Sequence, residues 1–330
     1  MRQHRARASA HPAERTAVRE PRGDRIFRAL TVTAGAFVLA TLVAIAAFLI
    51  IRAVPSLRTD TVNFLTEKKW LPDASPSVFG IAALAFGSVL SSLLAMIMAV
   101  PVAIGVAVFI TEYAPRRIAT ALGYLTDLLA AVPSVVYGLW GLYFLVPRMV
   151  PLQSFLADHF GWVPLFADPS NRTGQVSKSL FVAAVILAIM ILPIISAISR
   201  EVLRQVDTGH KEAALALGAT RWEMIRTAVF PPSRGALVSA AMLGLGRALG
   251  ETIAVALVLT AAFDINIRIL EPGGNTIAAN IATKFGESGI TGRSALIASG
   301  LVLFAITLAV NLAARAIIYR SGKVERSAAV

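Results

Sequence analysis

Long apolar runs alternate with short polar segments along most of the chain. Six runs reach the roughly 20 residues that an α-helix needs to cross a bilayer, and they lie at 29–51, 78–111, 118–147, 179–199, 235–262 and 294–318. Because Pro101 lacks a backbone N–H, we expect the second run to form one crossing with a kinked or protruding end. The pattern predicts an all-α integral membrane protein with about six transmembrane helices.

The first apolar run is too long for a secretory signal peptide. It spans residues 29–51, whereas the apolar part of a signal peptide has about 7–15 residues. We therefore expect it to remain as an anchoring helix. Residues 1–28 before it are rich in arginine, and we expect a basic, disordered tail that lies against anionic lipid headgroups.

The distribution of Lys and Arg predicts the orientation of the chain. If the N-terminus is inside, 19 of the 31 basic residues face the cytoplasm and 10 lie in the external loops. The inner segments are 1–28, 112–117, 200–234 and 319–330, and the outer loops are 52–77, 148–178 and 263–293. Basic residues concentrate on the cytoplasmic side of membrane proteins, so both termini, including the tail at 319–330, are predicted to be cytoplasmic.

Composition excludes several classes of protein. Of the 330 residues, 56% are hydrophobic and only 15% are charged, which is too little charge to cover a soluble enzyme of this size. The chain has no cysteine, and this excludes disulfides and thiolate metal sites. The net charge of +12 is spread along membrane flanks rather than gathered in a basic domain, so we expect no nucleic-acid partner.

Three ionisable residues lie well inside the apolar runs: Asp127, Arg247 and Glu251. On a continuous helix Arg247 and Glu251, four residues apart, share one face. Asp127 lies at a similar depth from the end of its own run, which suggests a pair with Arg247. Asp127 also begins a small, polar stripe that continues through Ala131, Ser134 and Gly138.

Two interpretations of these charges remain open. In the first, the three side chains form a salt-bridge network that only locks helices together. Alternatively, Arg247 contacts an anion that crosses the membrane, while the carboxylates hold and gate it. One arginine that is unpaired for part of the cycle suffices to attract an oxyanion.

The long inner loop at 200–234 predicts two short helices joined by an elbow. An amphipathic helix is expected over Arg200–Leu217, and Gly218 breaks it. Thr220 and Glu223 have the spacing of a capping box, which starts a second helix. We expect Pro231 and Pro232 to end that second helix, since neither donates a backbone hydrogen bond.

This elbow resembles the EAA loop of the permeases of ATP-binding cassette (ABC) importers. The positions that match the loop's pattern are Glu212, Ala213, Ala214, Gly218 and Pro231. Ala228 stands where a bulky aliphatic residue is usual, and Phe230 replaces a leucine. We expect these two departures to alter packing without changing the nature of the loop.

Two further stretches, 131–141 and 244–252, are similar to the phosphate permeases, and most of all to their PstC-type subunits. The resemblance covers about residues 75–320. It implies the type I ABC importer permease fold, with a core at 78–318 and the coupling loop at 200–234. The implied function is that of a transmembrane subunit that imports inorganic phosphate.

The resemblance also implies the partners and the site. The partners would be a PstA-like permease, a PstB-like ATPase dimer and a PstS-like external binding protein. ATP and Mg²⁺ would be bound by the ATPase, since this chain has no P-loop and is expected to hold no cofactor, no metal and no catalytic residue. The substrate path would involve Arg247, Glu251, Asp127, Ser134 and Tyr137.

Three alternatives stay open. An importer of another oxyanion, such as molybdate or sulfate, would share the fold and the elbow. A secondary transporter or channel would have no ATPase, and the elbow argues against it. A signalling or scaffold subunit would transport nothing.

Overall fold

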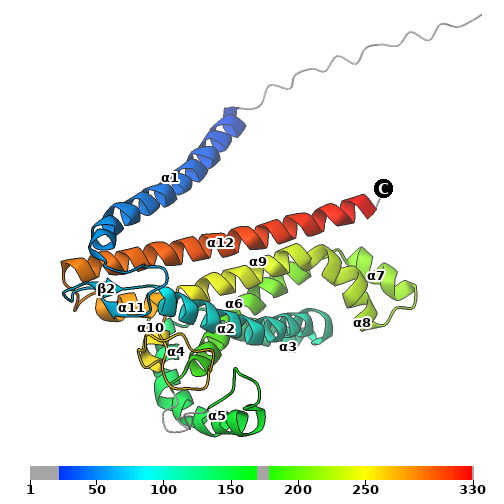
Figure 1. Ribbon diagram of the computed structural model, residues 1–330. Coiled ribbons are helices and arrows are strands. Elements are labelled where there is room, and N and C mark those ends of the chain that lie inside the picture. Colours follow the sequence, from blue (N-terminus) through cyan, green and yellow to red (C-terminus); the bar gives the residue numbers. More distant parts are fainter. Residues whose placement is uncertain (1–21, 169–177, 329–330) are drawn as a thin grey trace, which may run out of the picture. The chain divides into compact units, whose positions relative to one another are not determined.

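The computed structural model describes residues 22–168 and 178–328, with side chains as far as Ala316. In this part of the chain six helices are long and apolar enough to cross a membrane (Figure 1). They are Gly23–Thr59, Ala82–Tyr113, Ser134–Phe160, Leu180–Arg204, Arg221–Leu249 and Ile290–Ala316. Their number agrees with the six crossings predicted. The chain divides into two compact units, Met1–Phe48 and Leu49–Val330.

Helix α1 runs from Arg22 to Thr59 and contains the whole of the first predicted crossing. Residues 22–28 are helical, so their assignment to a disordered tail was wrong, and the rest of that tail lies outside the described residues. The end of α1 is fixed within the second unit. The Ser294 hydroxyl donates to the carbonyl of Arg52 at 2.5 Å and accepts the Ser56 N–H at 3.3 Å.

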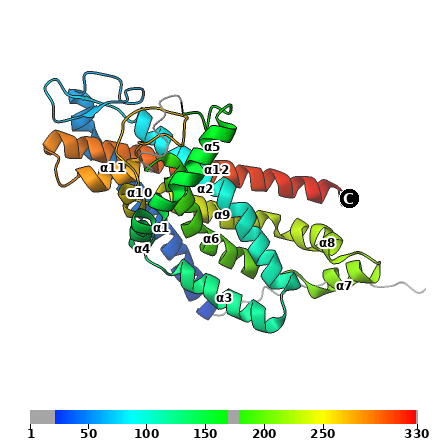
Figure 2. The same cartoon turned by 90° about the horizontal axis from the view of Figure 1, so that it is seen from below.

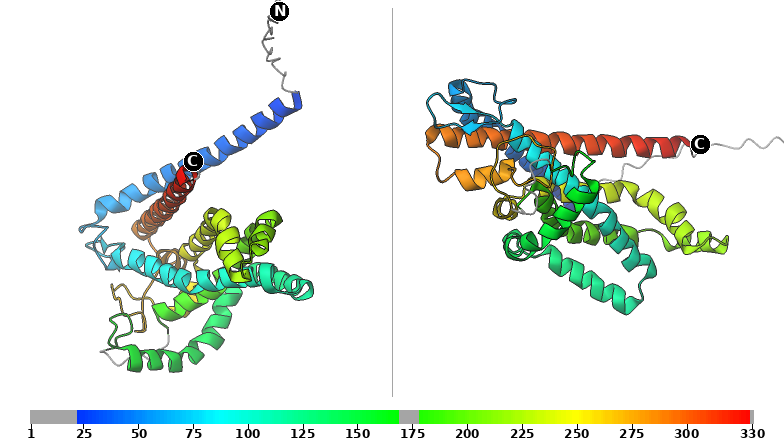
Figure 3. Two further views of the ribbon diagram at one scale, coloured as in Figure 1. Left: turned by 90° about the vertical axis from the view of Figure 1, so that its right-hand side faces the viewer. Right: turned by 60° about the horizontal axis from the view of Figure 1, so that its bottom comes forward.

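A short antiparallel hairpin covers one end of the second unit. Strand β1 (Trp70–Leu71) pairs with β2 (Val78–Phe79), and this hairpin lies beside α11 (Ile277–Lys284) and the start of α12 (Ile290–Ala328) (Figure 3). A buried cluster joins these elements, formed by Trp70, Phe79, Ile81, Leu84, Ile277, Ala295 and Leu296. The hairpin therefore has an apolar underside that anchors it.

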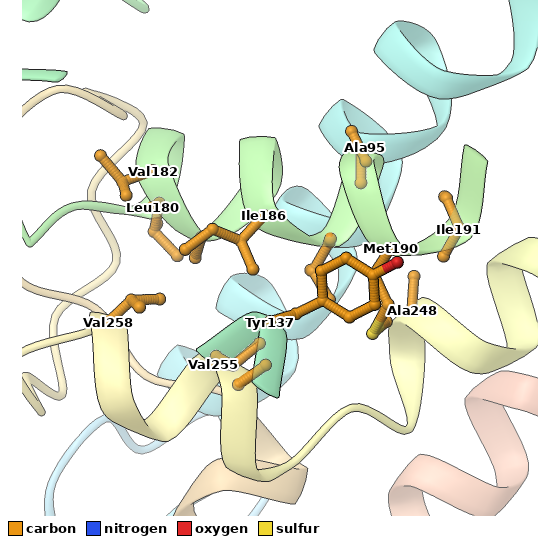
Figure 4. Close-up of a cluster of buried hydrophobic side chains, with 14 of the residues drawn as sticks. Ala95, Tyr137, Leu180, Val182, Ile186, Met190, Ile191, Ala248, Val255 and Val258 are labelled. Atoms are coloured by element: carbon orange, nitrogen blue, oxygen red, sulfur yellow. The ribbon is translucent and has the colours of Figure 1, made fainter. Parts of the chain in front are cut away.

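The most extensive helix contact in the described residues joins α2 (Ala82–Val108) to α6 (Leu180–Arg204). Every fourth residue along α2 is small and buried, namely Ala83, Gly87, Ser91, Ala95, Ala99, Ala103 and Ala107. Ala95, Ala99 and Ala103 pack in one cluster with Ile186, Met190 and Ile191 of α6 (Figure 4). Small side chains let two helix backbones approach closely in a membrane. Pro101 lies inside α2, which continues past it to Val108.

The third crossing differs from its predicted position at 118–147. Helix α3 (Arg116–Ala130) ends before Pro133, and α4 (Ser134–Trp140), a π-helical turn η2 (Gly141–Leu145) and α5 (Val146–Phe160) follow. Proline disfavours helical backbone at the residue before it and supplies no N–H. The prediction of one helix over 118–147 was therefore wrong, and the candidate span is Ser134–Phe160.

The fifth crossing is also divided. Helix α9 runs from Phe230 to Leu249, and the short helix α10 begins at Ile253 and ends at Val258. Residues 250–252 between them are not helical. The prediction of a continuous helix over 235–262 was wrong for this reason.

The elbow lies at the end of α9 away from α10 (Figure 2). The first predicted helix, 200–217, is two pieces, because α6 ends at Arg204 and α7 spans Thr208–Ala216. The N-terminus of α7 is capped by Asp207, whose carboxylate accepts the Gly209 N–H at 2.9 Å. Gly218 has a φ of +86°, a left-handed conformation that glycine adopts without strain.

The second elbow helix starts as predicted and ends differently. Helix α8 (Arg221–Met224) begins with a complete capping box between Thr220 and Glu223. A π-helical turn η3 (Ile225–Val229) then leads directly into α9. Pro231 and Pro232 lie in the first turn of α9, directly after η3, so they do not end the helix as we predicted.

The contact between the hairpin and α12 yields a prediction about stability. The Asp73 carboxylate accepts the N–H groups of Gly289 and Gly292 at 3.0 and 2.8 Å, and so satisfies two donors at the start of α12. We expect Asp73→Ala to lower the free energy of unfolding by about 1 kcal/mol, as for a lost helix cap. Thermal unfolding in detergent micelles measures this loss. Asp264→Ala, which removes an exposed acid elsewhere, is the control, and equal effects of the two substitutions would contradict the capping role.

Candidate functional site

Arg247 lies in the last turn of α9 and is exposed. Within 22–168 and 178–316 its guanidinium makes no hydrogen bond or ion pair. An unpaired arginine inside an apolar segment costs about 2.5–3.5 kcal/mol on insertion scales, so this side chain is expensive to keep and calls for a ligand or for water.

Glu251 does not share a helix face with Arg247, contrary to the prediction. It lies in the break after α9, where it is only 7% exposed. Its carboxylate accepts the N–H of Ala254 at 3.2 Å, in the first turn of α10. Gly250 has a low helix propensity, and the carboxylate two positions before α10 satisfies a backbone donor that the new helix leaves open.

Asp127 pairs with Arg200 of α6, so the predicted pair with Arg247 was wrong. The Arg200 Nη2 donates to both carboxylate oxygens of Asp127, at 2.9 and 3.0 Å, and its Nη1 donates to the Thr126 hydroxyl at 3.2 Å. Arg200 is 8% exposed. Gly123 makes the room, because a Cβ there would lie 2.6 Å from Nη1 of Arg200.

The polar stripe that we predicted from Asp127 to Gly138 is interrupted. Ala131 lies in the turn after α3, and Ser134 is the first residue of α4. The hydroxyl of Tyr137 donates to the Leu129 carbonyl at 2.9 Å, which bridges the break and satisfies an open carbonyl near the end of α3. Asp127 and Ser134 therefore belong to different helices.

Tyr137 stands at the centre of the buried cluster. Its ring packs among side chains of α6 and α9, with Met190 and Ala248 next to it in Figure 4. Ala248 directly follows Arg247 in α9, so a buried residue of this cluster and an exposed charge are adjacent in the chain. The site that results contains the Arg247 guanidinium, the Tyr137 ring and the helix break at 250–252.

Sequence reasoning missed Arg200 and the small residues of α2. Arg200 was taken as the first residue of the inner loop because it follows an apolar run. The fourfold spacing of small residues from Ala83 to Ala107 is visible in the sequence and would have indicated a helix-packing face. No comparable spacing marks Arg200, whose partner is set by how α3 packs on α6.

The elbow is attached to the π-helical turn η1 (Phe109–Tyr113), which directly follows α2. Lys211 Nζ contacts the Glu112 carboxylate at 2.6 Å, and both side chains are largely buried. A second buried cluster lies beneath, formed by Ala107, Val108, Leu203, Val206, Met224, Ile225, Val229 and Leu237, with Ala214 partly buried against it. Pro231 is half-buried at the start of α9, whereas Glu212, Ala213 and Gly218 are exposed.

The outer side of the elbow is apolar. Leu217 is 90% exposed, and Leu215 and Trp222 are also exposed. One face of the elbow is thus fixed to the helix bundle, and the other presents large apolar side chains with no covering segment among the described residues.

The sequence matches a protein family over most of its length. The family is described as "Binding-protein-dependent transport system inner membrane component", and its model matches residues 99–322. The chain belongs to this family. The match and the six apolar helices agree with the expected class, an all-α, multi-pass plasma-membrane protein with the ABC importer permease fold.

Named relatives narrow the similarity further. The chain is 46% identical over 300 residues to "Phosphate transport system permease protein PstC 2" of Mycobacterium tuberculosis, covering 90% of this chain and 92% of the relative. It is 41% identical over 313 residues to the PstC phosphate permease of Xylella fastidiosa, covering 93% and 94%. The predicted resemblance to PstC-type phosphate permeases is therefore confirmed.

Solved structures with a similar course of the chain are more distant. A chain of the inward-facing MetNI methionine ABC transporter is 17% identical, with a TM-score of 0.49, and covers 71% of this chain and 91% of that chain. A chain of a bacterial ABC transporter that imports alginate is also 17% identical, with a TM-score of 0.47, and the match covers 90% and 99%.

The ion pair between Asp127 and Arg200 gives a prediction that distinguishes it from the expected pair of Asp127 with Arg247. In a double-mutant cycle, Asp127→Asn and Arg200→Gln should show a coupling energy of about 1 kcal/mol, a modest value because the carboxylate is half-exposed. The same cycle with Arg247→Gln should give a coupling near zero. Unfolding in detergent measures both, and a larger coupling to Arg247 would contradict the pairing.

Proposed function

We propose that this chain is a transmembrane subunit of an ATP-driven importer of inorganic phosphate, in which Arg247 contacts the crossing ion. The observation that carries the proposal is an exposed arginine that has no hydrogen bond or ion pair among the described side chains. It lies beside a helix break in a chain whose relatives are named phosphate permeases.

The chemistry of the ion supports this role for Arg247. Phosphate near neutral pH carries between one and two negative charges, and a guanidinium binds two of its oxygens at once. Glu251 and Asp127 are engaged with other groups, so neither neutralises Arg247. This arrangement favours the anion-contact interpretation over a salt-bridge network of the three residues.

A single arginine also suits a transport path, which must release the ion as well as bind it. Tight binding halfway across the membrane would slow release, so affinity is better placed in an external PstS-like binding protein. The other half of the path comes from a homologous PstA-like permease. Tyr137 and Ser134, on α4, would line the path beside Arg247, and Glu251 would fix the backbone of the break. Asp127 positions α3 through its pair with Arg200.

The elbow would couple transport to ATP hydrolysis. Its exposed apolar side chains, led by Leu217, suit a cleft in a PstB-like ATPase, and Glu212 and Ala213 lie on the same exposed segment. Lys211 pairs with Glu112 of η1, which continues α2, so movement of the ATPase dimer would reach the membrane helices. ATP and Mg²⁺ would be bound by the ATPase alone.

The first test is phosphate uptake by cells that carry Arg247→Gln. We expect about a tenfold loss of labelled phosphate uptake, since one charge-assisted contact contributes about 1.5 kcal/mol or more. The amount of the chain in the membrane should not change. Arg58→Gln, an exposed arginine at the end of α1, is the matched control.

Competition identifies the ion in the same assay. Arsenate should compete with phosphate, while sulfate and molybdate should not. If uptake of labelled sulfate or molybdate depends on the chain, that oxyanion and not phosphate is the substrate. Uptake that continues without ATP hydrolysis would exclude the importer altogether.

The second test is docking of the ATPase at the elbow. Leu217→Asp should sharply reduce copurification of the ATPase and abolish uptake, because a charge replaces an apolar side chain that is 90% exposed and plays no part in the core. Ile290→Asp is the matched control, since Ile290 is 92% exposed at the opposite end of the second unit. Normal copurification with Leu217→Asp would refute the coupling role.

A further inference from the structure

A half-open hollow of about 220 Å³ lies between α9 and α12, which run side by side in Figure 1. Its lining is Ser239, Met242 and Leu243 from α9 and Asn311, Ala314 and Arg315 from α12. Three of these six side chains are polar, although both helices are candidate membrane spans. The hollow is separate from Arg247, Tyr137 and the elbow.

Arg315 supplies the charge of this hollow. It is exposed and lies in the last turn of the apolar run 294–318, which is the depth of the lipid headgroups. Among the side chains that the structure describes, none forms an ion pair or hydrogen bond with Arg315. No acidic residue lines the hollow, so a ligand there would meet an uncompensated positive charge.

The neighbouring polar groups complete a site for a phosphodiester. Asn311 Nδ2 donates to the Thr307 carbonyl at 2.9 Å, which leaves its second N–H for an anionic oxygen. The Ser239 hydroxyl donates to the Gly235 carbonyl at 3.0 Å, and its oxygen remains an acceptor for a hydroxyl group. Arg315 and Asn311 would therefore hold the phosphate, and Ser239 would accept from the alcohol attached to it.

Apolar side chains around the hollow indicate where the rest of the ligand lies. Leu243 on α9 is 60% exposed, and Leu308 and Leu312 on α12 are 49% and 57% exposed. They offer a surface for acyl chains directly beside the polar groups. Free phosphate has no apolar part that could contact such a surface. A second hollow, with Arg200 and Arg204, is lined by the Asp127 carboxylate, which would repel an anion.

We propose that the crevice between α9 and α12 is a binding site for an anionic phospholipid, whose phosphodiester is held by Arg315 and Asn311. Basic pockets between transmembrane helices bind anionic headgroups in this way. The membrane face concerned is the one reached by the C-terminal end of α12, which the Lys and Arg distribution assigns to the cytoplasm.

The test uses Leu243→Trp as a local reporter in the full-length chain, isolated in its membrane complex and reconstituted into vesicles. One set of vesicles contains a minor fraction of dibrominated phosphatidylglycerol in phosphatidylcholine. The other set carries the same fraction of bromine on phosphatidylcholine. The added fluorescence relative to the parent chain reports contact at the hollow, and we expect it to be quenched several-fold more strongly by phosphatidylglycerol.

Arg315→Gln should abolish this preference, so that the two lipids quench about equally, because the charge-assisted contact to the phosphodiester is lost. Arg315→Lys should retain part of it, and Asn311→Leu, which keeps the charge, should also reduce it. Arg204→Gln is the control, because it removes an exposed arginine elsewhere and should leave the preference unchanged.

Several outcomes would overturn the proposal. They are equal quenching by both lipids in the Leu243→Trp chain, an unchanged preference when either Arg315→Gln or Asn311→Leu is added to it, or an equal loss with Arg204→Gln. Displacement of the brominated lipid by inorganic phosphate at constant ionic strength would show a free-anion site instead.

Discussion

Close approach of helix backbones is the constraint on which the rest of this structure depends. Lipid tails are as apolar as leucine side chains, so burial of apolar surface contributes little to holding membrane helices together. The small residues that face α6 from α2 remove this difficulty, because they let dispersion contacts accumulate along the whole length of both helices. Helix α6 then serves as the axis against which α3, α9 and α10 pack.

Two interruptions of the helices create the candidate site. In a bilayer every backbone donor and acceptor needs a partner within the protein, and both interruptions meet this demand with a side chain. Tyr137 covers an open carbonyl of α3, and Glu251 covers an open N–H of α10. Each break beside the site thus has one open backbone group satisfied by a side chain of the protein itself. A continuous helix would have carried Glu251 to the same face as Arg247 and neutralised it.

Most features set by residues close together in the sequence were predicted correctly, whereas those set by distant residues were not. The membrane class, the number of crossings, the capping box at Thr220 and the elbow at Gly218 depend on neighbouring residues, and the sequence was sufficient for them. The helix breaks at 131–133 and 250–252 were missed because apolar composition hides them, although Pro133 and Gly250 mark both places. The partner of Asp127 could not be predicted from the sequence. Depth along a helix does not reveal which neighbouring helix turns an arginine towards it.

The connection between Lys211 and Glu112 has a thermodynamic consequence. The elbow is joined to η1 by this largely buried ion pair and to the end of α2 by the apolar cluster beneath it. Any ligand that binds the elbow more tightly at one spacing of α2 and α6 must alter that spacing. By reciprocity, whatever occupies the membrane site and prefers one spacing must change the affinity of the elbow by the same factor. This attachment therefore couples the two sites in both directions. Occupancy of the membrane site can change the affinity of the elbow surface, although the two are not in contact.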